Sequence, residues 1–176
     1  MGKQYKYLKE KDIEFIKEQK LFYIASCSSK EVNLSPKGYD TIRVLDEKTI
    51  VFANYPGSGN RTFRDAEADG EFTLVFNAFE GPAQILRIFC KAEIVKYPSK
   101  EFDEIHTLFN IKAGLIRDIF KFNIYAVESS CGASVPIMEY KEDRNALIDW
   151  VENMHKNNKL EDYKKKRHNP PNLTDL

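Results

Sequence analysis

The stretch Gly57-Ser58-Gly59-Asn60-Arg61-Thr62 gathers groups that suit a bound anion. It follows an apolar run and precedes a segment of helical character, so we expect it at the N-terminus of a helix, where unpaired N–H groups carry partial positive charge. Ser58, Asn60 and Thr62 add hydroxyl and amide donors, and Arg61 adds a guanidinium. Together these groups fit a phosphate monoester. An ordinary capped helix after a loop is the alternative, and the spacing matches neither of the common nucleotide-binding glycine motifs.

Two further cationic side chains, Lys37 and Arg87, lie in sequence contexts where a carboxylate or a bound anion could be their partner. Lys37, in the sequence Ser35-Pro36-Lys37-Gly38, is either a second cation over a bound anion or a surface lysine. Arg87 stands inside an apolar strand pattern, on the face of Ile85 and Phe89. A buried guanidinium needs a carboxylate or a bound anion beside it, and the pattern does not choose between these partners.

The remaining reactive side chains form no recognisable catalytic or metal-binding pattern. The histidines, His106, His155 and His168, are far apart, and no cysteine–histidine spacing matches a metal site. Cys131 lies in a loop of small residues without a neighbouring base, so we expect a packed or loop thiol rather than a nucleophile. We therefore name no catalytic residue and expect no metal.

Short strands and a few helices must position these groups. Apolar runs and alternation predict strands at 21–26, 31–35, 41–45, 49–54, 72–79, 83–97 and 119–128. Apolar residues at helical spacing predict helices at 9–18, 60–69, 99–109 and 144–156. Neighbouring strands are too close in sequence for parallel crossovers, so we expect an antiparallel sheet that closes into a barrel with helices outside.

Turn residues predict where these elements begin and end. Pro36 fixes φ and Gly38 permits a positive φ, which predicts a tight turn at 36–38. Asn60 is the expected N-cap of its helix, and Gly70 is the expected C′ residue. We expect one domain over residues 1–176, with an irregular tail over about 157–176.

Charge and hydropathy argue against several partners and compartments. Lys and Arg together number 27, as do Asp and Glu, so no net field directs the chain to nucleic acid or to an anionic membrane. No apolar run approaches the roughly 18 residues of a membrane-spanning helix. The segment 1–11 is charged and lacks the apolar core of a signal peptide. The three cysteines are far apart, so we expect reduced thiols and a cytoplasmic protein.

Four segments, taken in order, resemble one family. They are N-L-S-P-K-G-Y-D-T-I-R-V-L-D, G-S-G-N-R-T, F-N-A-F-E-G-P-A-Q-I-L-R-I and S-S-C-G-A-S-V-P. This combination resembles pyridoxamine 5′-phosphate oxidase-related proteins over most of the chain. The resemblance implies a mainly β fold, an antiparallel FMN-binding split β-barrel of Greek-key type, with about six strands and three to four peripheral helices. It also implies a homodimer with non-covalent FMN at the subunit interface.

The resemblance also implies roles for particular residues. Those beside the isoalloxazine ring are Asn33, Ser35, Pro36, Lys37 and Gly38. Those at the 5′-phosphate are Asn60, Arg61 and Thr62, and Ser58, just before them, is also expected to bind the cofactor. Lys37 matches a lysine that contacts substrate in the oxidase proper, and Arg87 falls on a strand that lines the FMN site.

The chain also departs from the oxidase proper. The C-terminal substrate pocket of that enzyme, with its tryptophan and R-x-H-type motif, has no clear match, and Trp150 lies in a predicted helix where packing explains it. The expected function is an FMN-dependent oxidoreductase that acts on an unidentified small molecule. The alternatives are a flavin-binding or storage module without turnover, a split barrel that binds haem or a deazaflavin, and a purely structural dimer.

Overall fold

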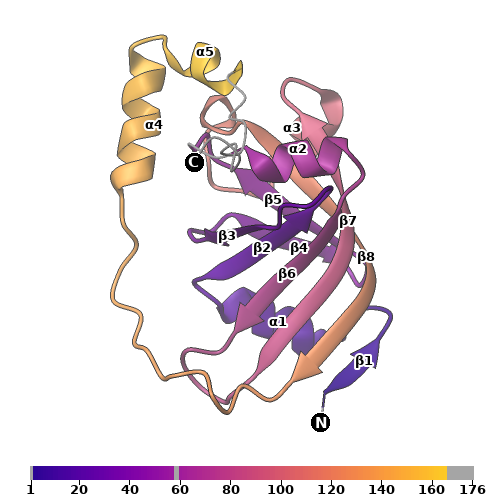
Figure 1. The fold of residues 1–176 in the computed structure, drawn as a ribbon. Coiled ribbons are helices and arrows are strands. Elements are labelled where there is room, and N and C mark those ends of the chain that lie inside the picture. The colour runs from indigo at the N-terminus through magenta and orange to yellow at the C-terminus, as the bar shows by residue number, and fades with distance from the viewer. Residues whose placement is uncertain (1, 58–59, 166–176) are drawn as a thin grey trace.

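A computed structural model describes residues 2–57 and 60–165 of the 176-residue chain (Figure 1). The strands are β1 (Lys3–Tyr5), β2 (Phe22–Cys27), β3 (Asn33–Lys37), β4 (Ile42–Asp46), β5 (Thr49–Asn54), β6 (Glu71–Asn77), β7 (Ile85–Lys96) and β8 (Asp118–Ser130). The helices are α1 (Glu10–Glu18), α2 (Arg61–Glu67), α3 (Lys100–His106), α4 (Ala146–Lys156) and α5 (Leu160–Lys165), with a 3₁₀ turn η1 (Ala113–Leu115). The predicted class, an antiparallel β fold with flanking helices, is confirmed.

The sheet curls because its two edge strands are consecutive in the chain. The strand order is β3-β2-β6-β7-β8-β5-β4, with β1 added beside β8. Only residues 38–41 connect β3 at one edge to β4 at the other. A connection of this length spans at most roughly 18 Å, so the edges must come together. We call the place where β3 and β4 approach each other, at Lys37 and Ile42, the seam.

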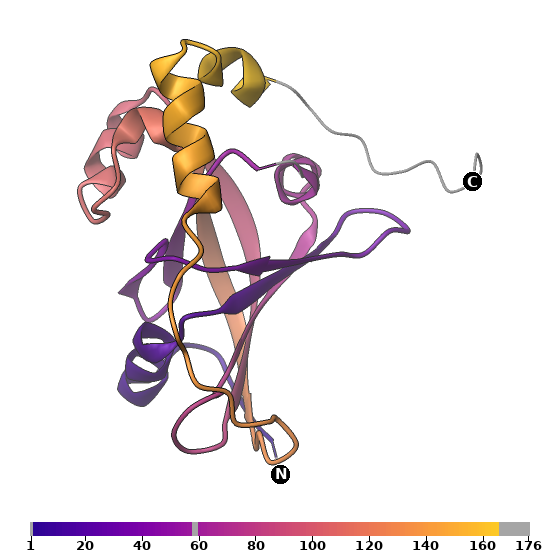
Figure 2. The same cartoon turned by 90° about the vertical axis from the view of Figure 1, so that its left-hand side faces the viewer.

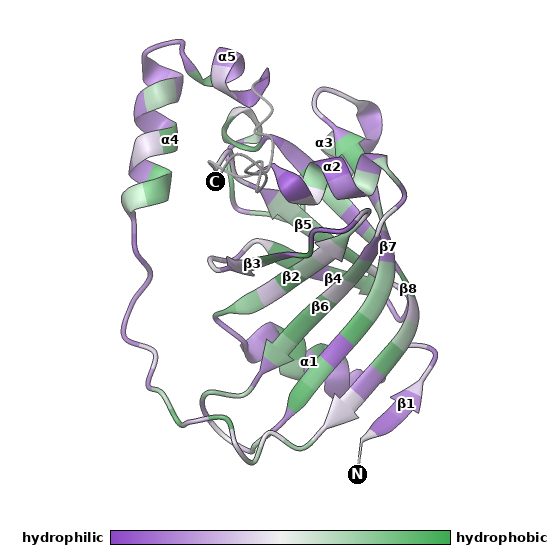
Figure 3. Cartoon of the chain, in the orientation of Figure 1, coloured by the Kyte–Doolittle hydropathy of each residue, from purple (hydrophilic) through white to green (hydrophobic). Residues whose placement is uncertain are grey.

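Aromatic side chains fill the interior of the curled sheet. Phe22 on β2 lies 5.4 Å from Phe76 and 5.7 Å from Phe52, measured between ring centroids. Phe52 belongs to β5, which is not a neighbour of β2 in the sheet, so this contact crosses the barrel. Hydrophobic residues run along β6 and β7 (Figure 3). Burial of large aromatic side chains is the main stabilising contribution to such a core.

The C-terminal helices form a separate layer at one end of the barrel. A long segment, 131–145, starts at the end of β8, rises along the outside of the barrel and leads to α4 at the opposite end, as Figures 1 and 2 show from two sides. Buried Leu115, Val151 and Leu160 join η1, α4 and α5 in a small apolar cluster. Trp150 packs edge-on against Tyr163 at 4.8 Å, which confirms the packing role predicted for it. Within the described residues, no helix is both long enough and apolar enough to cross a membrane.

The described part of the chain forms eight strands rather than the predicted six or so. β1 consists of three polar residues that carry no strand pattern, and it forms because it pairs with the end of β8. The predicted turn at 36–38 is also wrong in its position. β3 continues through Pro36 and Lys37, which pair with Tyr23 and Phe22. Proline is tolerated there because β3 is an edge strand whose outer N–H groups have no ladder partner.

Two turns use different residues from those predicted. The positive φ after β3 belongs to Tyr39, at 61°, and not to Gly38. At the end of α2, Asp69 takes the left-handed C′ position, with φ 51°, and Gly70 follows it. The amide of Gly70 donates to the Asp65 carbonyl at 2.7 Å, and the amide of Asp69 donates to the Ala66 carbonyl at 3.2 Å. These two bonds form a Schellman cap.

The C-terminal region is more ordered than predicted. α5 occupies part of the tail that we expected to be irregular, and the described chain has five α-helices rather than three to four. Lys164 is buried and donates to the Gly114 carbonyl at 2.6 Å, which anchors α5 on η1. Residues 166–176 of the predicted tail lie outside the described residues.

Candidate functional site

A cavity of about 480 Å³ lies at the seam of the sheet. Its walls come from β3, the connection to β4, the end of β5, the first turn of α2 and Leu147 of α4. Seven of the ten predicted site residues line it: Asn33, Ser35, Pro36, Lys37, Gly38, Arg61 and Thr62. Phe52 and Tyr55 add aromatic surface. The structure therefore brings together two chain segments that the sequence analysis singled out separately.

The alternation of β3 produces one polar wall of this cavity. Asn33, Ser35 and Lys37 are two residues apart, so their side chains share one face of the strand. Leu34, between them, is 63% exposed on the other face. Pairing with β2 places Ser35 opposite Ile24 and Lys37 opposite Phe22, which fixes the register of this wall.

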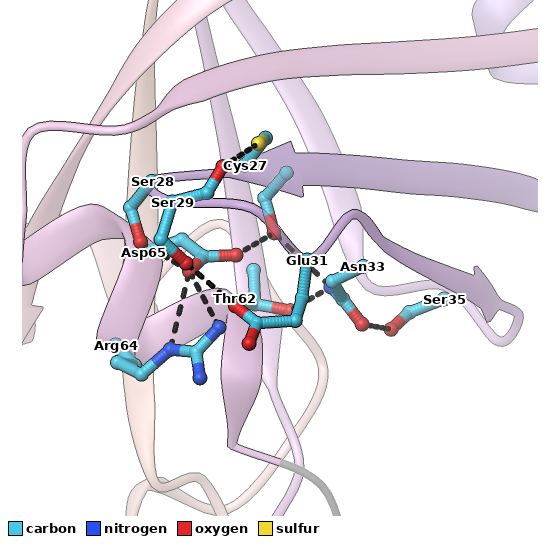
Figure 4. A network of polar contacts seen from close by, with 10 residues as sticks. Cys27, Ser28, Ser29, Glu31, Asn33, Ser35, Thr62, Arg64 and Asp65 are labelled. Carbon is cyan, nitrogen blue, oxygen red and sulfur yellow. Dashed lines mark hydrogen bonds and ion pairs between the residues drawn. The ribbon is translucent and has the colours of Figure 1, made fainter. Parts of the chain in front are cut away.

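A hydrogen-bonded network connects this wall to α2 (Figure 4). The Asn33 side-chain amide donates to Thr62 Oγ1 at 3.3 Å and to Ser26 Oγ at 3.1 Å. Ser35 Oγ donates to Asn33 Oδ1 at 3.2 Å. Asp65, one turn beyond Thr62 on α2, accepts from Ser26 at 2.7 Å. The network fixes β3 and α2 relative to each other on one side of the cavity.

Lys37 places an ammonium group with a lowered pKa in the cavity wall. Its ammonium lies 5.6 Å from the centre of the Phe52 ring. Burial lowers the pKa of Lys37, Asp118 opposes this shift, and Arg117 adds to it. An ammonium in such surroundings interacts more strongly with a bound anion than one in water does.

Arg117 and Asp118, behind Lys37, were missed by the sequence analysis. Both are buried at the start of β8. Arg117 Nη2 donates to the Gly57 carbonyl at 3.4 Å, and Asp118 accepts from Asn54 at 2.9 Å. The sequence does contain an indication of them, because two adjacent charges interrupt an apolar run from Leu115 to Phe120.

Of the other three predicted residues, Arg87 and Asn60 do not line the cavity. Arg87 on β7 instead makes an ion pair with Glu128 at 3.1 Å and donates to Ser130 at 3.1 Å. Asn60 is the N-cap residue of α2, as predicted, but its side chain makes no capping hydrogen bond. Its Nδ2 atom is buried and has no hydrogen-bond partner among the described residues. Ser58 lies outside the described residues.

The fold and the site together define an antiparallel barrel with a ligand-sized cavity at its seam. Comparison with known proteins agrees with this description. A family model described as Pyridoxamine 5′-phosphate oxidase matches residues 8–130. The chain belongs to this family, whose members commonly bind flavin. The family resemblance inferred from the sequence motifs is therefore confirmed.

Individual relatives are distant. The pyridoxamine 5′-phosphate oxidase family protein ustO of Aspergillus flavus is 27% identical over 135 residues, which are 71% of this chain and 52% of ustO. The chain thus spans about half the length of that relative.

Two solved structures show the same fold. A candidate pyridoxamine 5′-phosphate oxidase of Lactobacillus delbrueckii has a TM-score of 0.56 at 15% identity, covering 70% of this chain and 98% of its own. The HupZ protein of Group A Streptococcus has a TM-score of 0.57 at 18% identity, covering 68% and 91%. At these identities the structures support the fold and no more.

Proposed function

We propose that the seam cavity binds FMN non-covalently and that the protein is a cytoplasmic, FMN-dependent oxidoreductase acting on a small molecule. One observation carries the proposal: seven residues predicted for the cofactor lie on the wall of a single cavity. Family membership supports a flavin as the ligand. When bound, FMN would supply hydride and one-electron chemistry that no side chain of the cavity provides.

The chemistry of the cavity fits FMN at both ends. Its volume of about 480 Å³ falls in the range of roughly 300–1,000 Å³ that is typical of small-molecule sites. Arg61 and Thr62 offer a guanidinium and a hydroxyl to a phosphate, and the unused amide of Asn60 lies next to them in the chain. Phe52, Tyr55 and Lys37 offer aromatic surface and a cation to the ring end of the ligand.

The test of this proposal is the colour and content of the purified protein. We expect a flavin absorption spectrum, release of FMN on denaturation identified by mass, and recovery of the spectrum when FMN is added to the ligand-free protein. A colourless protein that also fails to take up added FMN would overturn the proposal.

A second copy of the chain is part of the proposal. Val32, just before β3, is 69% exposed, and Leu34, on β3 itself, is 63% exposed. β3 is the edge strand that forms the cavity wall. Exposed apolar side chains on the outer face of an edge strand favour a subunit contact there, on the opposite face of the strand from the cavity. Light scattering at micromolar concentration should give the mass of a homodimer, and a monomeric mass would contradict a shared site.

A flavin-binding module without turnover is the second candidate. Among the described residues that line the cavity, none is a histidine, cysteine, aspartate or glutamate, which leaves Lys37, Tyr39 and Tyr55 as the groups there that could transfer a proton. Such a module would bind FMN but show neither reduction by a pyridine nucleotide nor substrate-dependent reoxidation. Among the same described residues, haem iron would find the phenols of Tyr39 and Tyr55 but no imidazole or thiolate.

Replacing Lys37 by methionine is expected to stabilise the ligand-free protein and to weaken flavin binding. Burial lowers the pKa of Lys37, so the charged amine costs stability in the folded state. We expect the free energy of unfolding to rise by about 1 kcal/mol near neutral pH. Lys100→Met, at a lysine whose side chain is 92% exposed, is the matched control and should change neither quantity.

The stability gain of Lys37→Met should fade as the pH rises. Between the lowered pKa of folded Lys37 and its ordinary value of 10.5, the unfolded chain keeps a proton that the folded chain has lost. Wild-type stability therefore increases with pH over that interval, and the advantage of the methionine variant shrinks. Urea denaturation of both proteins from about pH 7 to about pH 10 measures the difference in their free energies of unfolding. A difference that stays constant over this range would contradict the prediction.

Arg87→Ala is expected to leave flavin affinity within a factor of about two, because the structure pairs Arg87 with Glu128 and not with the cavity. Loss of this half-exposed ion pair should cost at most about 1 kcal/mol of stability. Fluorescence titration with FMN is the measurement. A large loss of affinity would mean that the flavin reaches β7, from the same protomer or from a second copy.

A further inference from the structure

Asp65 is a fully buried carboxylate behind the cavity wall, and it does not itself line the cavity (Figure 4). Its Oδ2 atom accepts from Ser26 Oγ at 2.7 Å. Its Oδ1 atom accepts from Ser28 Oγ at 2.7 Å and from Arg64 Nη2 at 3.1 Å. All the partners are donors, as an ionised carboxylate requires.

The carboxylate determines the direction of the next hydrogen bond. Since Asp65 only accepts, the Ser26 hydroxyl must donate its single proton to Asp65. Ser26 then has only lone pairs to offer to Asn33, so the Asn33 group that faces it at 3.1 Å must be the Nδ2 amide. An asparagine side chain has two similar orientations, and here the network decides between them.

The orientation of Asn33 in turn determines what two cavity residues offer to a ligand. Its second amide proton is directed at Thr62 Oγ1, 3.3 Å away, so the hydroxyl proton of Thr62 is left to be donated elsewhere. Its Oδ1 atom accepts the proton of Ser35, 3.2 Å away, so Ser35 has only lone pairs left. Thr62 and Ser35 both line the cavity.

We propose that Asp65 is a positioning residue that sets the hydrogen-bond polarity of the cavity wall. Through Ser26 and Asn33 it makes Thr62 a donor and Ser35 an acceptor. The matching ligand carries an oxyanion beside Thr62 and a hydroxyl donor beside Ser35. The side-chain amide of Asn33 lies between these two positions. A phosphorylated polyol chain has this arrangement, and the assignment rests on the proposed binding of FMN, whose ribityl phosphate is such a chain.

Asp65→Asn should reverse this polarity without changing the shape of the side chain. Arg64 and Ser28 both donate to the Oδ1 position, so the new carbonyl oxygen must take that place. The new amide then donates to Ser26, which must pass its proton to Asn33. The Asn33 side chain turns over, and Thr62 donates to Asn33 instead of to the ligand.

The ratio of FMN to riboflavin affinity measures this effect, because only FMN carries the phosphate. We expect Asp65→Asn to lower the ratio about tenfold while riboflavin affinity stays within about twofold, because a ribityl hydroxyl can accept from Ser35 as well as donate to it, whereas a phosphate can only accept from Thr62. Thr62→Val should lower the ratio similarly, and Asp65→Asn added to Thr62→Val should lower it no further. Asp12→Asn is the matched control: Asp12 is equally buried in α1 and accepts from Tyr5 and Lys9, far from the cavity. It should reduce stability and leave the ratio unchanged.

Equal loss of FMN and riboflavin affinity in Asp65→Asn, or additive effects on the ratio, would overturn the positioning role. A second measurement does not depend on flavin. In the ligand-free wild-type protein, nuclear Overhauser contacts should join the Asn33 amide protons to the Thr62 methyl group and the Ser26 β-protons. Contacts to the Ser35 β-protons instead would overturn the inference even if the variant fails to fold. Failure of the wild-type protein to bind either flavin would contradict the proposed function, and the amide contacts would still decide the polarity.

Discussion

Arg61→Ala is expected to weaken FMN binding by about 2–4 kcal/mol, which is about 30- to 700-fold in the dissociation constant, and to leave the fold intact. Arg61 is half-buried in the first turn of α2 and lines the cavity next to Thr62. A guanidinium makes paired, charge-assisted hydrogen bonds to phosphate, and their loss leaves the anion partly desolvated without a partner. Titration of ligand-free protein with FMN is the measurement.

Three controls accompany the Arg61 variant. Riboflavin, without the phosphate, should bind the variant and the wild-type protein alike. Arg61→Lys keeps the charge but loses the planar fork, so its affinity should fall between the other two. Arg144→Ala removes an exposed arginine near the start of α4 and should have no effect. Unchanged FMN affinity in Arg61→Ala would place the phosphate elsewhere.

Gly70→Ala is expected to destabilise the protein by about 2–4 kcal/mol. A Cβ atom at this position would lie 2.7 Å from the Cys27 carbonyl oxygen and 2.8 Å from the Asp65 carbonyl oxygen. Both contacts are to backbone, so neither can be relieved by a side-chain rotation. The end of α2 and the end of β2 would have to move apart, and this movement would disrupt the Schellman cap. Urea denaturation measures the loss.

Gly38→Ala is the matched control for Gly70→Ala. The nearest atom to its added Cβ would be the Lys20 carbonyl oxygen at 3.6 Å, an ordinary van der Waals distance, and Gly38 does not have a positive φ. Its stability should change by less than about 1 kcal/mol. A Gly70 variant as stable as the Gly38 variant would show that the backbone at the end of α2 can move at little cost.

The parts of the fold that followed from sequence are those with a strong local pattern. β5, β6, β7 and β8 were predicted because β-branched and apolar residues alternate along them. β1 and α5 were missed for a shared reason. Each is short and polar, and each forms because of a distant partner, β8 for one and η1 for the other. Such elements depend on tertiary contacts that local propensity does not contain.

The candidate site divides in the same way. Lys37, Arg61 and Thr62 could be predicted because their types and neighbours suggest an anion site. Arg117 and Asp118 could not be placed there, because only the return of β8 beside β5 brings them behind Lys37. Arg87 shows the converse, since a cation in an apolar strand needs a partner and the sequence could not show that this partner is Glu128.

The turn residues show a third kind of limit. Gly38 and Gly70 were both predicted to adopt positive φ, yet Tyr39 and Asp69 take those conformations. Glycine at 70 is required by the space beside Cys27 rather than by its backbone angle. A close approach between distant backbone segments has no signature in the local sequence. The importance of Gly70 could therefore be predicted, but the reason that glycine is required there could not.

The seam between β3 and β4 has a consequence for how the molecule opens. The two edge strands are not paired with each other in the sheet, whereas β7 and β8 have neighbours on both sides along most of their length. Amide protons of β3 and β4 should therefore exchange with solvent through small local openings, and those of β7 and β8 only through larger ones. A ligand in the cavity touches β3 and β5 together, so it should slow exchange in β3 far more than in β7. Hydrogen exchange with and without FMN would then locate the bound flavin without any substitution.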